Sequence, residues 1–243
     1  MLAFRAVCKN ANCQFKRRKR RVTTSCLRLI RIKCISNWKP NLFGRFLSRV
    51  ASFGISPYHQ QAQLASLTRH GFVSADAVIP RFGLVRGIHV YLGHGTTISR
   101  TDSVSEIRLG DNVQIYGNAF LEVGAGALIE IGMGSHIQPG CHIHAHINSI
   151  RIGEFVEIGP NCAFYSYNHG ISKGCMVMHQ ALESKGEISI GGGSWLGHGV
   201  VVLDGVVVGK NAIIGAGSVV THNIPENAIA AGIPAKVIRF RNN

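Results

Sequence analysis

The sequence predicts an all-β protein built as a parallel β-helix solenoid, and three observations support this fold class. Hydrophobic residues form 46% of the 243 residues, which is enough for one sizeable core. Glycine is abundant, at 29 residues, but it stands among many valines, isoleucines and leucines, so the composition is that of an ordered chain. From residue 190 onward an aliphatic residue also recurs at every sixth position.

The six-residue repeat has two regular positions. The aliphatic position is occupied by Ile190, Leu196, Val202, Val208, Ile214 and Val220. Four residues later stands a small or β-branched residue, namely Ser194, Val200, Val206, Ala212, Ser218 and Ile224. Six residues suffice for a short strand and a turn, and coils of such units must stack to bury their apolar side. The pattern predicts two coils over 190–225 and about three more over 107–165.

Interruptions of the repeat divide the chain. Residues 1–72 lack the repeat and form a short basic N-terminal segment that we expect to be partly helical or disordered, with helices over 42–51 and 60–70. Residues 73–243 form the β-helix domain, beginning with an irregular first coil and ending in a C-terminal tail over 226–243. A loop excursion over 166–187 protrudes from the solenoid, and long excursions from a regular fold are usually functional.

Charge is concentrated at one end of the chain. Residues 1–75 contain 15 Lys or Arg and no Asp or Glu. Residues 76–243 contain 11 Lys or Arg and 12 Asp or Glu. The basic segment admits three interpretations: peripheral contact of residues 16–35 with anionic membrane lipid, nucleic-acid binding, or a leader without a role. We expect no nucleic-acid partner. No apolar run approaches the length of a membrane span, so we expect a cytoplasmic protein, at most at the inner face of the membrane.

The cysteines and histidines predict no metal site. The cysteines are odd in number and lack a C-x-x-C pair, which disfavours both a disulfide framework and a zinc site; they are Cys8, Cys13, Cys26, Cys34, Cys141, Cys162 and Cys175. Cys141 and Cys162 fall on the small position of the repeat and are predicted to pack in the core. Alternate histidines at 142, 144 and 146 could bind a metal, but outward positions on one strand explain them better.

The repeat resembles that of the hexapeptide-repeat acyltransferases, and the match is strongest over 188–240. The Asn168-His169 pair in the loop, the run Ser194-Trp195-Leu196-Gly197 and the tail over 231–239 carry the resemblance. The closest subgroup is the sugar and polysaccharide O-acetyltransferases. The resemblance implies a left-handed β-helix, acetyl-CoA as the acyl donor, a homotrimer, and a small-molecule or saccharide acceptor.

The same resemblance implies a catalytic histidine. A hydroxyl is a poor nucleophile at neutral pH and needs a general base, and histidine titrates in that range. His169 would remove the proton from the acceptor hydroxyl, which attacks the thioester directly, with Asn168 and His146 beside it. Many relatives carry an acidic residue just before this histidine, where Ser166 and Tyr167 stand here. A backbone carbonyl, His146 or Glu157 could orient the ring instead.

Coenzyme A binding is implied along the C-terminal coils. Relatives hold the cofactor between two subunits, beside an aromatic strand that Trp195 matches. Lys236 and Arg239 suit the phosphates of the donor. The residues implied to bind the donor are Trp195, Gly197, His198, Ala216, Thr221, His222, Lys236 and Arg239.

Two other functions remain open at this point. A metalloenzyme similar to the γ-class carbonic anhydrases would share the solenoid and use three histidines, and a solenoid without catalytic activity could serve as a scaffold. The sequence names neither the acceptor nor the choice between O- and N-acetylation.

Overall fold

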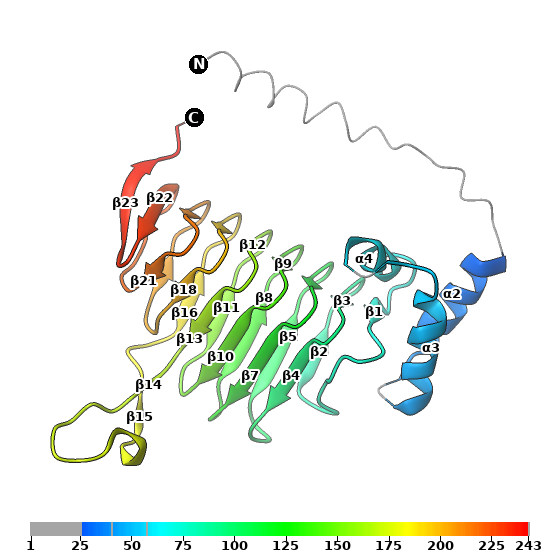
Figure 1. The fold of residues 1–243 in the computed structure, drawn as a ribbon, viewed down its shortest axis with the longest axis horizontal. Helices are drawn as coiled ribbons and strands as arrows, with labels where there is room; N and C mark the ends of the chain where they lie inside the picture. Colours follow the sequence, from blue (N-terminus) through cyan, green and yellow to red (C-terminus); the bar gives the residue numbers. More distant parts are fainter. Residues whose placement is uncertain (1–25, 40, 57, 243) are drawn as a thin grey trace.

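The computed structural model describes residues 26–39, 41–56 and 58–242, which form a long solenoid with helices at one end (Figure 1). Two-residue to five-residue strands stack in parallel on three faces. A loop protrudes near the other end, and the C-terminal strands close that end. The predicted fold class, an all-β left-handed parallel β-helix with a protruding loop, is therefore confirmed.

Each face of the solenoid is one sheet, and we name the three sheets A, B and C. Sheet A contains β1 (Phe72–Val73), β3 (Tyr91–Leu92), β6 (Gln114–Ile115), β9 (His136–Ile137), β12 (Glu157–Ile158), β17 (Trp195–Leu196), β20 (Ile213–Ile214), β22 (Ala228–Gly232) and β23 (Ala235–Phe240). Sheet B contains β4 (Thr97–Arg100), β7 (Phe120–Gly124), β10 (His142–His146), β13 (Ala163–Tyr165), β18 (Val201–Val202) and β21 (Val219–Val220). Sheet C contains β2 (Leu84–Arg86), β5 (Glu106–Leu109), β8 (Leu128–Ile131), β11 (Ile150–Ile152), β16 (Ile188–Ile190) and β19 (Val207–Val208).

The repeat places its aliphatic residue inside the solenoid. The second residue of each short strand points inward and stacks on its counterparts, so Ile115, Ile158 and Leu196 are fully buried. Removing this apolar surface from water is the main driving force for stacking the coils. Successive coils also approach closely at the corners, where a side chain on Gly132 would lie 2.5 Å from the carbonyl carbon of Gly153. The corner therefore requires glycine there.

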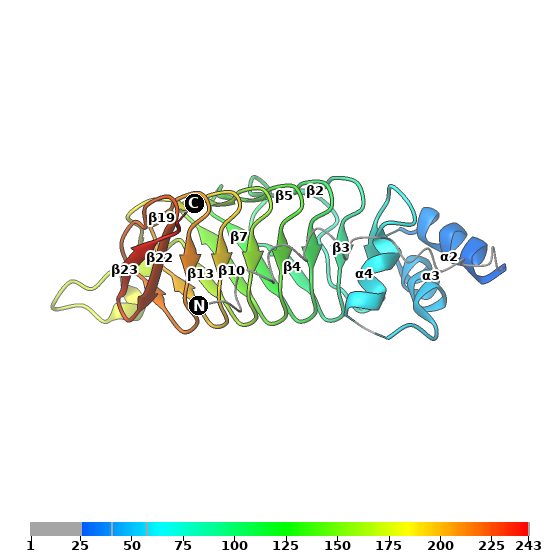
Figure 2. The same ribbon diagram turned by 90° about the horizontal axis from the view of Figure 1, so that it is seen from above.

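Three helices cover the N-terminal end of the solenoid (Figure 2). They are α2 (Cys26–Ser36), α3 (Leu42–Ser52) and α4 (His59–Ala65). Leu64 and Ala65 of α4 are buried in one cluster with Tyr91 and Tyr116 of the first coils. The helix predicted over 42–51 is observed as α3. The helix predicted over 60–70 is shorter, because α4 ends at Ala65, and the sequence did not predict α2.

The other end of the solenoid is closed by an antiparallel strand. After the last coil β22 pairs with β23, which runs back along it from Ala235 to Phe240. The hydroxyl of Ser218 accepts a hydrogen bond from the Gly232 amide and so attaches the hairpin to the coil below. The C-terminal tail is thus part of sheet A.

The structure also bears on the membrane and cysteine predictions. None of the described helices is long and apolar enough to cross a membrane. Cys141 and Cys162 are fully buried in the solenoid core, as predicted, and Cys175 is exposed in the loop. Cys8, Cys13 and the basic block over 16–21 lie outside the described residues.

Candidate active site

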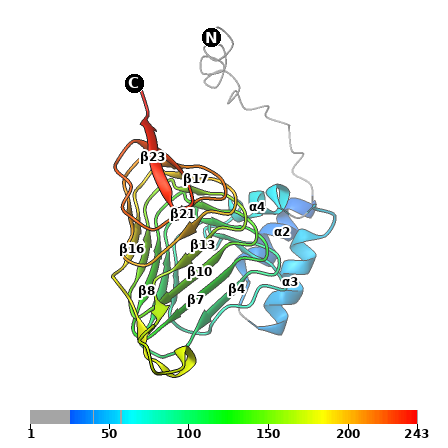
Figure 3. The ribbon, with the colours of Figure 1, turned by 60° about the vertical axis from the view of Figure 1, so that its left-hand side comes forward.

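The loop excursion leaves the solenoid at the corner between sheets B and C. It follows β13 of sheet B and returns to β16 of sheet C. Its base is an antiparallel pair of β14 (Asn168–His169) and β15 (Leu182–Glu183), and its outer part includes the short 3-10 helix η1 (Val177–His179). Figure 3 shows the loop projecting from this corner. His169 therefore stands on the paired base of the loop and not at its tip.

A buried carboxylate fixes the base of the loop to the next coil. The side-chain amide of Asn168 donates a hydrogen bond of 2.6 Å to Asp204 Oδ1, and the Lys185 amide donates one of 2.7 Å to Oδ2. Asp204 itself is only 4% exposed. One carboxylate thus ties both arms of the loop to the turn after β18. Sequence reasoning missed Asp204, because it lies 36 residues after Asn168 and only the stacking of the coils brings the two together.

His169 is exposed and lines a cavity of about 430 Å³ at this corner. The other lining residues come from the two arms of the loop and from the turn after β18; they are Asn168, Ile171, Glu183, Ser184, Lys185, Leu203 and Asp204. The cavity is large enough for a small ligand. An exposed imidazole beside a cavity of this size can accept a proton from a ligand hydroxyl placed there.

The residues just before His169 support the loop from below. The Ser166 hydroxyl is buried, accepts a hydrogen bond from the His146 amide and donates to the Asn148 carbonyl at 2.6 Å. The Tyr167 ring lies edge-on to the His146 ring, with 5.5 Å between the centroids. Burial raises the pKa of the Tyr167 hydroxyl above its usual value. His146 therefore supports the segment that leads to Asn168.

Glu157 and His146, two side chains considered for orienting the His169 ring, lie in different parts of the solenoid. Glu157 lies on sheet A, where it accepts hydrogen bonds from His136 and Gln138. Burial alone would raise the pKa of Glu157, but these two donors outweigh it and lower the pKa. Glu157 thus has partners on its own face of the solenoid. His146 lies on the same corner as His169 and contacts Tyr167.

The alternate histidines form an aromatic ladder on the outer face of sheet B. The rings of His142 and His144 are nearly parallel, 5.8 Å apart, and His144 stacks on Tyr165 at 5.1 Å. Burial lowers the pKa of His144. The predicted outward positions around Ile143 are observed, and the residues that the structure describes contain no group of three or more metal-binding side chains arranged to hold an ion.

The residues implied to bind the donor lie in three places. Trp195 is 52% exposed on sheet A, and Gly197, His198 and Ala216 follow at the corner between sheets A and B. A Cβ on Gly197 would lie 2.7 Å from the Ala216 nitrogen, so the coils touch backbone to backbone there.

The second and third groups lie toward the C-terminal end. Thr221 and His222 follow β21 at the corner between sheets B and C, and their side chains are 2.8 Å apart. Lys236 and Arg239 are exposed on β23.

Within one chain, the candidate base and the candidate donor residues are on different sides of the solenoid. His169, Thr221 and His222 share the corner between sheets B and C, whereas Trp195 lies on sheet A, the face opposite that corner. The structure therefore brings His169 together with Asn168 and Asp204, but it does not bring His169 together with Trp195.

Comparison with known proteins shows what this solenoid is similar to. The family model for the bacterial transferase hexapeptide (six repeats) matches residues 187–222. An N-acyltransferase from Bacillus cereus, a variant of AntD, has a similar fold, with a TM-score of 0.53 at 18% identity over 66% of this chain and 83% of that chain. The C-terminal repeats match this family model and the fold is similar to that of the AntD variant, so the resemblance found in the sequence is confirmed.

Sequence relatives give a more particular likeness. The galactoside O-acetyltransferase of Escherichia coli (strain K12) is 40% identical over 100 residues, which cover 39% of this chain and 46% of that protein. The galactoside O-acetyltransferase of Lactococcus lactis is 37% identical over 111 residues, covering 43% of this chain and 53% of that protein. The chain thus spans about half the length of the curated relatives it matches.

Proposed function

We propose that this chain is an acetyl-CoA-dependent O-acetyltransferase that acts on a hydroxyl of a sugar or saccharide. The observation that carries the proposal is His169, held beside a cavity by the Asn168–Asp204 hydrogen bond. The two galactoside O-acetyltransferases that resemble the chain support transfer of an acetyl group to a sugar hydroxyl.

In this proposal His169 is the general base. Its imidazole takes the proton of the acceptor hydroxyl as the hydroxyl oxygen bonds to the thioester carbonyl carbon. The carbon–sulfur bond then breaks, and the departing CoA sulfur takes the proton from His169. Asn168 is a positioning residue, because its side chain donates to Asp204 and so fixes the strand that carries His169. His146 supports the same strand through its contact with Tyr167.

The donor fits residues that are exposed in a single copy of the chain. Coenzyme A is a polyanion with a long pantetheine arm, and Lys236 and Arg239 are exposed cations on β23. The exposed Trp195 ring offers an apolar surface for the arm. We expect the backbone at Gly197, His198, Ala216 and Thr221 to contact the arm, and His222 to lie near a phosphate.

We also propose that the active form is a homotrimer. His169 and Trp195 lie on different sides of the solenoid, so in this proposal the base and the aromatic residue that act on one ligand come from two copies. In a three-fold arrangement, the corner between sheets B and C of one copy would face sheet A of the next. A monomer at working concentration with full activity would contradict this part of the proposal.

We further propose a location at the cytoplasmic face of a membrane, with peripheral contact through residues 16–35. Residues 16–25 lie outside the described part of the chain. Within the described part, Arg28, Arg31 and Lys33 of α2 support the contact through their positive charge.

The test measures release of free CoA thiol from acetyl-CoA with a panel of sugars and amino sugars. His169→Ala should lower kcat by roughly 10²- to 10⁴-fold with little change in CoA affinity. His179→Ala is the matched control, because His179 is another exposed histidine of the same loop. Alkali-labile acetyl groups in the product would identify O-acetylation. Equal turnover of the two variants would refute the role of His169.

A further inference from the structure

Helix α3 turns its two phenylalanines away from the protein, although Leu47 and Val50 of the same helix pack on the core. Gly44, Ser48 and Ala51 face the protein and are buried, whereas Phe43 and Phe46 are 60% and 61% exposed. Globular helices normally bury their large apolar residues and expose their polar ones. The aromatic side of α3 is therefore an exposed apolar surface that calls for a partner.

The orientation of α3 is fixed by close packing on its small residues. A Cβ at Gly44 would lie 1.7 Å from the Lys39 carbonyl oxygen, so no other residue fits there. The buried Ser48 hydroxyl donates a hydrogen bond of 2.7 Å to the Val73 carbonyl at the start of the solenoid. Rotating the helix to bury its phenylalanines would break both arrangements. The outward aromatic side is thus built into the packing.

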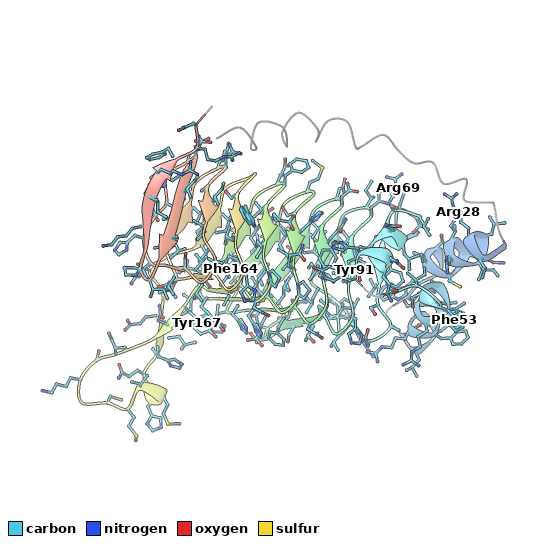
Figure 4. The ribbon with its side chains drawn as sticks, turned by 45° about the horizontal axis from the view of Figure 1, so that its top comes forward. Arg28, Phe53, Arg69, Tyr91, Phe164 and Tyr167 are labelled. Atoms are coloured by element: carbon cyan, nitrogen blue, oxygen red, sulfur yellow. The ribbon has the colours of Figure 1, made fainter. Side chains whose placement is uncertain are left out.

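Neighbouring residues extend this surface across two helices. Phe53, just after α3, is 82% exposed, and Leu27 and Leu29 of α2 are each about 60% exposed. An apolar groove of about 340 Å³ lies between the helices, lined by Leu27, Ile30, Arg31, Arg49, Val50 and Phe53. We call the exposed residues of α2 and α3, with Phe53, the helical-end surface. Figure 4 shows Arg28 and Phe53 at this end of the molecule.

The charge of the helical-end surface has one sign. Arg28, Arg31, Lys33, Arg45 and Arg49 lie on the two helices, and residues 1–75 contain no Asp or Glu. The ion pairs of the described residues all lie in the solenoid, between residues 76 and 187. A partner of this surface must therefore accept apolar side chains and supply negative charge.

We propose that the helical-end surface binds the headgroup region of an anionic lipid bilayer. Binding of an amphipathic helix to a membrane interface depends on buried apolar area together with attraction to anionic lipids, and this surface has both. The proposal refines the membrane contact proposed above for residues 16–35: α3 and Phe53 are the inserting elements, with Arg45 and Arg49 at headgroup level. It does not rest on the acetyl-transfer chemistry.

The position of the surface leaves the candidate active site free. The helices lie at the opposite end of the solenoid from the loop that carries His169 (Figure 1). Four strand spacings separate β1 from β12 in sheet A, and each spacing is roughly 4.8 Å, so the loop corner lies about 20 Å along the solenoid. Lipid binding and catalysis can thus be measured separately.

The experiment is co-sedimentation of the full chain with vesicles of phosphatidylcholine alone or mixed with phosphatidylglycerol, at low and at high salt. We expect binding only to the anionic vesicles. Phe43→Ser combined with Phe46→Ser should weaken binding at least tenfold. Arg45→Gln and Arg49→Gln should each weaken it about fivefold. Phe82→Ser is the matched control, because Phe82 is 79% exposed in the solenoid and should not affect binding.

Two outcomes would overturn the proposal. Unchanged vesicle binding by the double phenylalanine variant would show that other basic residues carry the interaction. A lower oligomeric mass of that variant in analytical ultracentrifugation, without lipid binding by the parent chain, would identify the surface as a contact between copies. Unchanged circular dichroism of the variant controls for folding, since both phenylalanines are exposed.

Discussion

Replacing Asp204 with alanine removes two hydrogen bonds that hold the loop to the solenoid. The carboxylate accepts from the Asn168 side chain and from the Lys185 amide, one on each arm of the loop. Hydrogen bonds to a charged group contribute about 1.5–3 kcal/mol each, so the loop base should lose roughly 3 kcal/mol or more. The open form of the loop should then be populated at least about a hundred times more often.

Amide hydrogen exchange measures this opening directly. In Asp204→Ala the Lys185 amide should exchange at least about a hundredfold faster, while amides of the buried coils stay protected. Asp102→Ala is the matched control, because Asp102 also accepts backbone hydrogen bonds at a corner, but far from the loop. If Lys185 exchange were the same in Asp204→Ala and the parent chain, the loop would be held by other contacts and the reasoning would be refuted.

Two further predictions concern the solenoid. Phe164→Ala should cost about 3–5 kcal/mol and lower Tm by roughly 10 °C in calorimetry, because Phe164 is fully buried; Phe155→Ala, at an exposed position, should change it little. The pKa of His144 is lowered from 6.5, so the folded protein binds fewer protons than the unfolded chain, and stability should fall as pH drops below about 6.5. Between pH 7.5 and pH 5 the urea midpoint of His144→Gln should fall less than that of the parent chain. An equal fall in both proteins would show that His144 is not the source of the pH dependence.

The hexapeptide period predicted the solenoid because every unit repeats one local interaction. The position of Ile214 alone indicates that it points inward, and stacking on Leu196 follows from the repeat. No repeat governs the helical end, where α2 mixes arginine and lysine with apolar residues. Its helical state depends on packing against α3, and single-sequence reasoning does not give that contact.

The candidate site was also predicted only in part, because some of its contacts form only when the coils stack. His169 could be found from its place at the interruption of the repeat, since an excursion from a solenoid marks itself. Asp204 lies 36 residues after Asn168, two corners of successive coils brought together by stacking. The position of His169 relative to Trp195 depends on which sheet each segment joins. Insertions in the repeat change the sheet that a given segment joins, so the sequence alone does not give this position. Local pattern therefore indicated the candidate base but not the residue that supports it.

The two closed ends determine how long this molecule is. A stack of parallel coils has unpaired backbone groups at both ends, and a second molecule could add to either one without limit. Here α4 covers the first coil, and the antiparallel β23 ends the last one, because an antiparallel strand cannot continue a parallel stack. Whole coils could be gained or lost between these ends without changing either closure. Loss of one closure would leave a single open edge at which two copies could pair, and only loss of both would allow a fibre to grow.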